Sequence, residues 1–262
     1  ANILIDTKLA AKGYTFINVD EGWLAGRDAT GQIFENATKF PNGMKGLGEW
    51  VKSQPTYPGS PHRFKYGLYT CRGTCQCSSP DYQGPGSYGH YAGDVEWLVA
   101  AGADFLKVDS CCASQDHATA FAEYAQIRNA LNATGHPVFF SLCGWHEWYA
   151  PPDNSLNYTG GASLGNSWRI AGDGRDYAAL ANCMNTIAPL TAYAGPGGYN
   201  DPDLLIGPNV RVGGQTDEQS RAQFTVWCVM AAPLIISVDL RTSTPFAFET
   251  FGNTELIAVN RE

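Results

Sequence analysis

Short apolar runs in this sequence end, one after another, on a polar residue that can carry chemistry. Six runs close on an aspartate or a cysteine, at Asp20, Asp109, Cys143, Asp173, Asp203 and Asp239. With Tyr69 included, the intervals are about 30 to 50 residues, which is room for one strand, one helix and two loops. Such repetition is typical of a (β/α) barrel, in which the carboxyl ends of the strands meet in one bowl. We therefore expect several of these side chains to share a site.

Hydrophobic periodicity predicts the same alternation of elements. Seven strands are expected, at 14–20, 65–70, 105–109, 138–143, 167–173, 199–206 and 233–239. Helices are expected at 2–12, 95–102, 116–131, 176–187, 217–232 and 245–251, and a cysteine-rich loop at 71–93. Gly13 is the expected stop of the first helix, and Asp116 the expected N-cap of the third. The pattern predicts an α/β fold with one domain over 1–262, a TIM-type (β/α)8 barrel that lacks its first strand in this chain.

Composition narrows the classes of ligand. The net charge is −8, with 25 acidic and 17 basic residues, whereas phosphate binding depends on clustered Lys and Arg. Nucleic acid is therefore not an expected partner. No membrane partner is expected either, because no apolar stretch reaches the roughly 18 residues of a membrane helix. Aromatic residues make up 12% of the chain, which suits stacking on apolar sugar faces, although most of the rings are expected in the core.

Cysteines and glycosylation triplets indicate a compartment. Five of the eight cysteines form two groups, Cys71, Cys75 and Cys77, then Cys111 and Cys112. The first group lacks the paired C-x2-C spacing and downstream His ligands of structural zinc sites, so disulfides are favoured over a metal. Three N-x-[ST] triplets add glycosylation candidates at Asn36, Asn132 and Asn157. Together they predict a secreted protein, or one in the lumen of the secretory pathway, whose chain starts after any signal peptide.

Two of the strand-end aspartates have a cation close by in the sequence. Asp109 follows Lys107 by two residues, and Asp173 follows Arg169 by four. Two such carboxylates can flank a glycosidic bond, where one attacks or assists water and the other protonates the leaving oxygen. A single strand-end aspartate is more often a helix cap or a loop anchor, and Asp239 is interpreted as a cap. Four or more on one barrel rim favour a shared site for a polyol.

Eight segments in order along the chain carry a more specific signal. They are FINVDEGW (16–23), KFPNGMKGL (39–47), YGLY (66–69), LKVDSC (106–111), SLCGW (141–145), WRIAGD (168–173), GPGGYNDPD (195–203) and MAAPL (230–234). These segments resemble the motifs of glycoside hydrolase family 27, the α-galactosidase family, whose V-D-D-G-W motif is similar to the first of them. The resemblance spans nearly the whole chain.

This resemblance implies a retaining mechanism, with Asp109 as the nucleophile and Asp173 as the general acid and then base. Retention requires carboxyl groups about 5 to 5.5 Å apart, and it requires Asp109 ionised and Asp173 protonated at the start. The resemblance also implies that Asp20 binds the axial 4-hydroxyl and that Cys77 and Cys111 form a disulfide. The other positions implied to bind or border the sugar are Glu21, Tyr69, Lys107, Gly144, Trp148, Arg169 and Asp203, with Cys77 and Cys111 beside them. A second bridge using Cys112 stays open, as does the pairing of Cys143.

Two departures from the family pattern bear on the substrate. Glu21 stands where the family usually has a second Asp, and its longer side chain would intrude on the 6-hydroxymethyl group of galactose. β-L-Arabinopyranose has the same ring stereochemistry without that group, so a β-L-arabinopyranosidase is the first alternative. Gly144 replaces a bulkier residue and would leave room for a 2-acetamido group, which makes an α-N-acetylgalactosaminidase a weaker alternative.

The prediction for function is a secreted, retaining exo-glycosidase that hydrolyses terminal α-D-galactosyl residues. Its expected partners are oligo- or polysaccharides that end in galactose or L-arabinopyranose. An inactive carbohydrate-binding barrel is the alternative from another class, and the presence of Asp109 and Asp173 disfavours it. No metal and no organic cofactor is expected, because carboxylate acid–base chemistry needs neither. The C-terminal β-sandwich of the family is expected to be absent from this chain.

Overall fold

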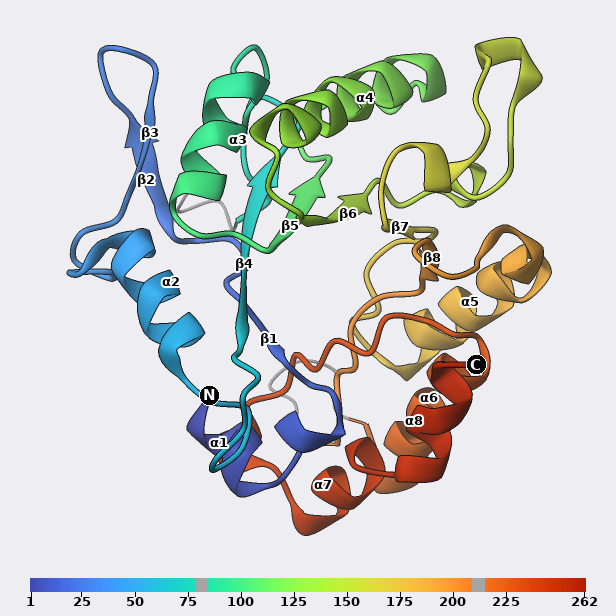
Figure 1. Cartoon of the computed structure of the whole chain (residues 1–262). Helices are drawn as coiled ribbons and strands as arrows, with labels where there is room; N and C mark the ends of the chain where they lie inside the picture. The colour runs from blue at the N-terminus through green and yellow to red at the C-terminus, as the bar shows by residue number, and fades with distance from the viewer. Residues whose placement is uncertain (79–83, 209–214) are drawn as a thin grey trace. The chain divides into compact units, whose positions relative to one another are not determined.

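The computed structural model describes residues 1–78, 84–208 and 215–262, and it divides into two compact units (Figure 1). The first unit comprises residues 15–143 together with Ala1. The second unit comprises residues 2–14 and 144–262. Within the described ranges, none of the helices combines the length and the apolar character needed to cross a bilayer.

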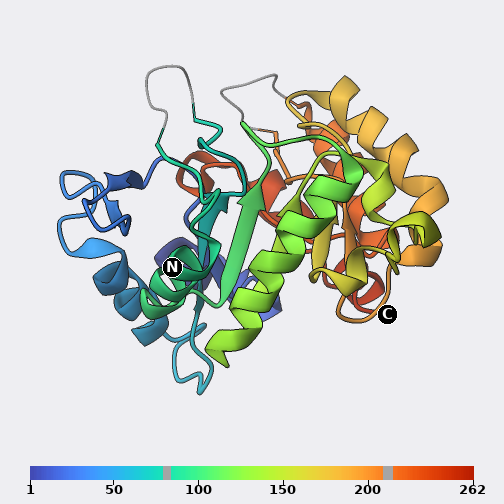
Figure 2. The same cartoon turned by 90° about the horizontal axis from the view of Figure 1, so that it is seen from above.

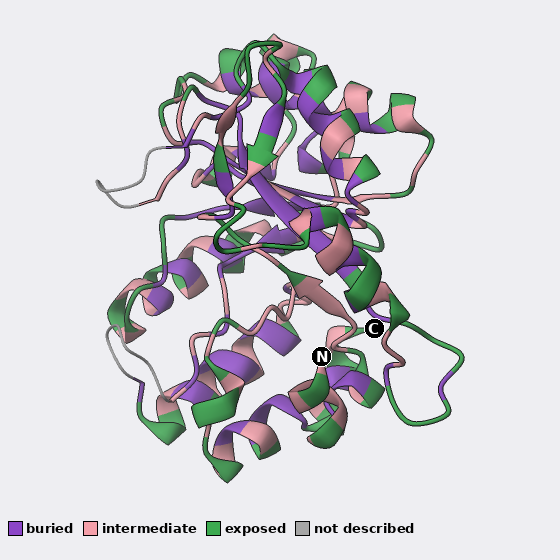
Figure 3. Cartoon of the chain, turned by 90° about the vertical axis from the view of Figure 1, so that its left-hand side faces the viewer, coloured by how far each residue is buried: buried purple, intermediate pink, exposed green. Residues whose placement is uncertain are grey.

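Parallel strands form the centre of the first unit. Their spatial order is β1 (Phe16–Asn18), β4 (Lys65–Cys71), β5 (Phe105–Asp109) and β6 (Phe139–Cys143). The register places Cys71 beside Asp109 and Asp109 beside Cys143, so three strands end level with one another. Strand β4 is buried from its second residue to its last, as expected for a parallel strand covered on both faces. Figure 3 shows buried segments in strands and helices alike. The carboxyl ends of the strands therefore form one edge in this unit, as predicted.

Helices and a hairpin accompany this sheet. They are the hairpin β2 (Leu24–Arg27) and β3 (Ile33–Glu35), and the helices α2 (Gly43–Ser53), α3 (Tyr91–Ala100) and α4 (His117–Thr134). Helices α3 and α4 pack against each other (Figure 2). Asp116 caps α4 as predicted, since its carboxylate accepts the Thr119 N–H at 2.9 Å. The hairpin and α2 were not predicted from periodicity.

The second unit contains two paired strands among helices. Strands β7 (Ser167–Arg169) and β8 (Tyr199–Asp201) are parallel, with Arg169 opposite Asp201. The α-helices are α1 (Asn2–Asp6), α5 (Tyr177–Ile187), α6 (Asp217–Val229), α7 (Pro245–Phe251) and α8 (Thr254–Asn260). Short 3-10 turns lie at Ala10–Lys12, Glu147–Tyr149, Asn154–Leu156, Gly161–Ser163, Ala188–Tyr193 and Leu240–Thr242.

Two buried tryptophans hold the strand ends of the second unit. The indole N–H of Trp168 donates to Asn200 Oδ1 at 2.7 Å, and that of Trp227 donates to the carbonyl of Asp203 at 2.8 Å. Neither indole is exposed to solvent. Because a buried indole N–H needs a partner, these bonds hold the Asn200 side chain within β8 and the backbone of Asp203 just after it.

The expected strand 233–239 does not form as a strand. A parallel bridge between Leu205 and Ile236 is what the structure has there, with Leu205 N–H donating to the Ile235 carbonyl at 2.8 Å. The prediction was wrong because an apolar run does not by itself supply a partner strand: residues 233–236 are half-buried and form one bridge rather than a ladder. Asp239 instead caps a 3-10 turn by accepting the Arg241 N–H, so its interpretation as a cap is confirmed.

Two other boundaries differ from the prediction. The expected helix 2–12 breaks after α1 because Lys8 adopts a left-handed conformation, with φ of 63°, and it resumes as a 3-10 turn that Gly13 ends as predicted. Strands β7 and β8 are shorter than the predicted 167–173 and 199–206. After β8 the chain turns at Asp203, whose φ is 103°, so extended pairing cannot continue.

Helix α6 offers a test of local stability. Its capping box joins Thr216 and Gln219 through reciprocal bonds of 3.2 and 2.9 Å. We expect Thr216→Ala to lower the free energy of unfolding by about 1 kcal/mol, since an N-cap side chain is lost. Thr225→Ala on the same helix is the matched control, because Thr225 bonds only back to Arg221 O within the helix. Urea unfolding followed by circular dichroism checks both; equal losses would contradict the capping argument.

Candidate active site

The first unit gathers carboxylates around one lysine at the carboxyl edge of its sheet. We call Asp20, Tyr69, Lys107 and Asp109 the Asp109 cluster. Lys107 Nζ lies 2.9 Å from Asp20 Oδ2 and 3.9 Å from Asp109 Oδ2, and it sits 5.2 Å from the centre of the Tyr69 ring. Four positions predicted from the sequence are thus brought together. The arrangement follows from the register, since Tyr69 and Lys107 are opposite each other on β4 and β5.

The carboxylate of Asp109 is buried and held from two sides. The Tyr69 hydroxyl donates to its Oδ2 at 3.2 Å, and the Ser110 N–H donates to its Oδ1 at 2.9 Å. Its side chain is 8% exposed, whereas that of Asp20 is 49% exposed. Burial and the charge of Asp109 raise the pKa of Tyr69, so the phenol remains a donor. Asp109 is therefore oriented and desolvated, while Asp20 stays open to a ligand.

Lys107 carries the countercharge of this cluster. Burial acts to lower the pKa of the lysine, but Cys143, Asp20 and Asp109 outweigh it, and the pKa of Lys107 is raised. The ammonium group is therefore charged throughout the physiological range. Because the ammonium group attracts both carboxylates, Oδ2 of Asp20 and Oδ2 of Asp109 both face Lys107 Nζ.

Side chains outside the Asp109 cluster hold its members in place. The indole N–H of Trp23 donates to the Tyr69 carbonyl at 3.0 Å, and the indole stacks on Trp97 at 5.3 Å between ring centres. Arg72, which is fully buried, donates through Nε to the Ser110 hydroxyl at 3.0 Å and also pairs with Glu123. Sequence reasoning did not identify Trp23, Arg72 or Ser110 as part of the site.

Two disulfides tie the loop after β4 to the loop after β5. The bridges are Cys77–Cys111, as predicted, and Cys75–Cys112, which resolves the question left open for Cys112. Neither bridge includes Cys143, which is buried at the end of β6. Cys71 is a buried thiol whose pKa burial raises to about 12, so it is unreactive as a nucleophile. Part of the loop, 79–83, lies outside the described residues.

The second unit has its own cluster, in which one arginine lies between two carboxylates. We call Arg169, Asp173, Arg175 and Asp203 the Asp173 cluster. Arg169 Nη2 lies 2.9 Å from Asp203 Oδ2 and 3.2 Å from Asp173 Oδ1. Arg175 Nη2 lies 3.2 Å from Asp173 Oδ2. Arg169 and Asp203 are buried, whereas the side chain of Asp173 is 48% exposed.

Asp173 is held in the charged form by its described neighbours. Burial acts to raise its pKa, but the nearby Arg169 and Arg175 guanidinium groups and their hydrogen bonds outweigh it, and the pKa is lowered. The expectation that Asp173 is protonated at the start is therefore not met by these surroundings. Arg175 was not predicted as a member of this cluster. The signal that could have identified it is its position in the sequence, two residues after Asp173.

Asp203, which the resemblance implies to bind or border the sugar, is buried and anchors the neighbouring loop. Besides its ion pair with Arg169, its Oδ2 accepts the Gly174 N–H at 2.6 Å and its Oδ1 accepts the Leu204 N–H at 2.7 Å. Gly174 directly follows Asp173, so this bond fixes the loop that carries the acid. Asp203 therefore supports the cluster, and its role in binding the sugar stays a prediction.

Gly144 differs from what was expected of it, whereas the role of Trp148 beside the sugar stays a prediction. A Cβ atom on Gly144 would overlap the ring of Tyr149, so the space beside this glycine is already filled. The room for a 2-acetamido group inferred from Gly144 is therefore not present at that position. Trp148 lies in the turn Glu147–Tyr149, half-buried, between the imidazole of His146 at 4.9 Å and the Tyr149 ring at 4.1 Å.

The remaining predicted positions lie at the surface. Glu21 is exposed, and its backbone N–H donates to Asp20 Oδ1 at 2.8 Å, so its backbone is bonded to a member of the Asp109 cluster. Asn132 and Asn157 are exposed and Asn36 is half-buried, and glycosylation at all three stays a prediction. Within residues 1–78, 84–208 and 215–262, His, Cys, Asp and Glu side chains form no group of three that could hold a metal ion.

A half-buried lysine and a buried arginine, each paired with strand-end carboxylates on parallel strands alternating with helices, define an α/β protein of the kind that binds polar ligands at its strand ends. The chain belongs to the α-galactosidase A family, whose family model matches residues 1–262. An α-galactosidase of Cyamopsis tetragonoloba is 37% identical over 268 residues, covering all of this chain and 59% of the relative. The chain thus spans about three fifths of the length of such curated relatives.

Solved structures agree with this family. α-Galactosidase I from Mortierella vinacea matches with a TM-score of 0.82 at 28% identity, covering 100% of this chain and 66% of that one. An α-galactosidase from Saccharomyces cerevisiae, solved with raffinose, matches with a TM-score of 0.79 at 28% identity, covering 100% and 60%. The barrel-type α/β fold predicted from the sequence is thereby confirmed.

The pair of arginines around Asp173 leads to a measurable consequence. We expect Arg175→Gln to raise the pKa of Asp173 in the sugar-free protein, because one of the two cations that favour the carboxylate is removed. Carbon-13 NMR titration of the aspartate carboxyls would measure it. Arg241→Gln is the matched control, since Arg241 pairs with Asp239 two residues away in the same manner. An Asp173 titration unchanged by Arg175→Gln, or moved equally by the control, would contradict the assignment.

Proposed function

We propose that this chain carries the catalytic machinery of a retaining α-galactosidase that hydrolyses terminal α-D-galactosyl residues. One observation carries the proposal: two carboxylates, one beside the half-buried Lys107 and one beside the buried Arg169, have opposite environments. Asp109 is buried and oriented by two donors, while Asp173 is half-exposed on a loop. Unequal surroundings are what divide two carboxylates into different roles. Relatives named α-galactosidase support the choice of sugar.

In this proposal Asp109 is the nucleophile. Its donors leave the carboxylate pointing in one direction, which reduces the reorganisation needed before attack on the anomeric carbon. Asp173 then protonates the leaving oxygen and later takes a proton from water. Since its neighbours lower its pKa in the sugar-free protein, the proton has to be favoured by desolvation when the sugar covers the exposed half of the side chain.

Asp20 and Lys107 supply the sugar contacts of the first unit. The carboxylate of Asp20 is 49% exposed and is held at 2.9 Å by the ammonium of Lys107. Such a pair accepts from one sugar hydroxyl and donates to another, and we assign the axial 4-hydroxyl to Asp20. Galactose-terminated oligo- and polysaccharides are the proposed partners, and a secretory location is proposed from the disulfides and the glycosylation triplets.

Azide, an external nucleophile, distinguishes the proposed role of Asp109 as nucleophile from that of Asp173 as acid and base. We expect Asp109→Ala and Asp173→Ala each to reduce hydrolysis of p-nitrophenyl α-galactoside, the first by about 10⁴-fold or more, because the nucleophile is lost. With azide present, Asp109→Ala should release β-galactosyl azide by one displacement, and Asp173→Ala should release α-galactosyl azide by two. Proton NMR of the products distinguishes them. The same azide anomer from both variants would overturn the assignment of roles.

Asp239→Ala is the control for these variants. Asp239 also ends an apolar run, but it is used as a cap on a 3-10 turn. The variant should retain hydrolysis within about twofold of the unchanged protein. A carbohydrate-binding protein without catalysis would instead bind galactose and give no azide product with either active-site variant.

The alternative substrate is a β-L-arabinopyranoside, and Glu21 is the observation that favours it. Glu21 is exposed immediately after Asp20, whose Oδ1 accepts its N–H. We expect Glu21→Asp to raise the ratio of α-galactosidase to β-L-arabinopyranosidase activity by roughly tenfold, since one methylene is worth about 1 to 3 kcal/mol of selectivity. Comparing kcat/KM on the two p-nitrophenyl glycosides measures the ratio. A ratio that stays constant removes Glu21 as the selecting residue.

A further inference from the structure

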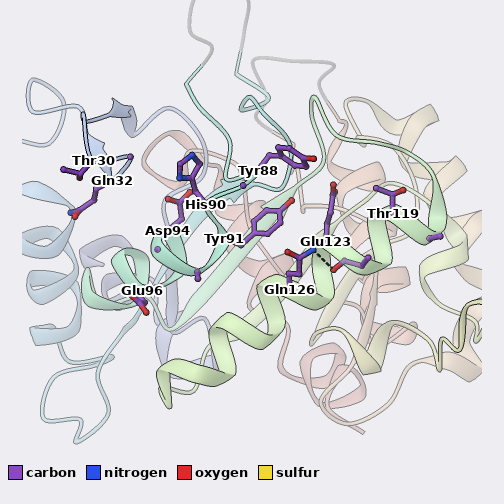
Figure 4. Close-up of a pocket in the computed structure, with 16 residues that line it drawn as sticks. Thr30, Gln32, Tyr88, His90, Tyr91, Asp94, Glu96, Thr119, Glu123 and Gln126 are labelled. Atoms are coloured by element: carbon purple, nitrogen blue, oxygen red, sulfur yellow. Dashed lines mark hydrogen bonds between the residues drawn. The ribbon is translucent and has the colours of Figure 1, made fainter.

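A groove on the first unit is lined by residues that the proposed chemistry does not use (Figure 4). It has a volume of about 1170 Å³ and lies along the turn between β2 and β3, the start of α3 and the first turns of α4. Gln32, Tyr88 and His90 line it from one side, and Thr119 and Gln126 from the other. The volume exceeds the usual range of roughly 300 to 1,000 Å³ for a small-molecule site. An extended ligand of several rings fits such a space.

The charges in the groove are largely compensated. Asp94 pairs with Arg27, with 2.6 Å between Nη1 and Oδ1, and Glu123 pairs with the buried Arg72. Glu96 is the remaining carboxylate in the lining, and it is exposed at the edge. Among the described residues that line the groove there is no lysine or arginine. An anionic ligand would therefore meet carboxylates and no countercharge, whereas a neutral ligand would meet little net field.

The groups that remain are suited to hydroxyls and ring faces. Gln32, Thr119 and Gln126 are exposed, and amides and hydroxyls both donate and accept. Among the residues that the structure describes, the side chain of Gln126 has one hydrogen bond, a long one of 3.5 Å to the Ala122 carbonyl (Figure 4). Tyr88 is 57% exposed, which is the largest exposure among the aromatic side chains described as exposed. Small residues complete the lining and let a ring approach the backbone: Gly31, Gly89, Ala92, Gly93, Ala118 and Ala122.

The segment that carries Tyr88 is hydrogen-bonded to the end of β4 and to the loop that follows it. The N–H of Tyr88 donates to the Gly73 carbonyl at 3.1 Å, and that of Ser87 donates to the Cys71 carbonyl at 2.7 Å. The hydroxyls of Thr70 and Ser87 also bond at 2.7 Å. Because Thr70 directly follows Tyr69 in β4, one wall of the groove is built on the same strand end as the Asp109 cluster.

We propose that this groove is a carbohydrate-binding site for a neutral oligosaccharide segment, with Tyr88 as the stacking platform and the amides of Gln32 and Gln126 as hydroxyl partners. It would hold the body of a polysaccharide whose terminal galactosyl residue is cleaved. The role of the groove in cleavage rests on the proposed function, whereas the binding site itself does not. The platform and the amides come from three separate segments, so each can be removed without touching the Asp109 cluster.

The test uses the full-length protein and galactomannan, a neutral polysaccharide with galactosyl branches. Tyr88→Ala and the double variant Gln32→Ala, Gln126→Ala are compared with Tyr57→Ala, a matched control whose 41% exposed ring lies outside the groove. Affinity electrophoresis with excess galactose in the gel measures binding outside the galactose site. We expect both groove variants to weaken retention by roughly fivefold or more and the control to match the unchanged protein. Retention should be the same with and without about 0.5 M NaCl, because salt screens charged contacts and has little effect on uncharged ones.

Kinetics gives the second readout. The groove variants should raise KM for galactomannan by roughly fivefold and leave kcat/KM on p-nitrophenyl α-galactoside within about twofold. Groove variants that bind galactomannan as the control does, retention abolished by galactose, or retention lost in salt would each overturn the proposal. A protein that hydrolyses neither substrate but still needs Tyr88 for retention would refute the α-galactosidase proposal alone. Circular dichroism shows whether each variant is folded.

Discussion

The ammonium group of Lys107, shared by two carboxylates, is the interaction on which the first unit's site depends. Asp20 and Asp109 carry like charges on separate strand ends, and without the lysine their repulsion would oppose both burial and alignment. Lys107 is itself costly to bury, which explains why it lies between the carboxylates and over the ring of Tyr69. The strand register is what delivers these groups to one place, since β4 and β5 pair without a shift.

In the second unit, an arginine rather than a lysine balances the like charges of two carboxylates. Arg169 has a planar fork, and it divides its contacts between the buried Asp203 and the half-exposed Asp173. Asp203 uses its other lone pairs on backbone N–H groups, including that of Gly174. The result is a rigid inner pair and a more exposed outer carboxylate. In each unit, then, one cation, half-buried in the first and buried in the second, pairs with two acids whose exposures differ several-fold.

The sequence was most informative where a local rule and a tertiary rule agree. Strand ends at Asp109 and Cys143, the cap at Asp116 and the Cys77–Cys111 bridge were all predicted, the last from family resemblance alone. Prediction failed where neighbours in space decide. Tyr149 fills the space beside Gly144, and one bridge at Ile236 replaces an expected ladder. No pattern in a single sequence reports what occupies the volume next to a glycine.

The state of Asp173 illustrates a further limit of reasoning from sequence. Its role as an acid can be inferred from a motif, but its proton affinity depends on Arg175, an exposed side chain that the motif does not include. The neighbours of Asp173 favour the carboxylate, and the role requires the carboxylic acid. Covering a half-exposed carboxyl with a sugar removes water from it and opposes the charge. Ligand binding and protonation of Asp173 would therefore be linked, so that a bound sugar itself prepares the acid.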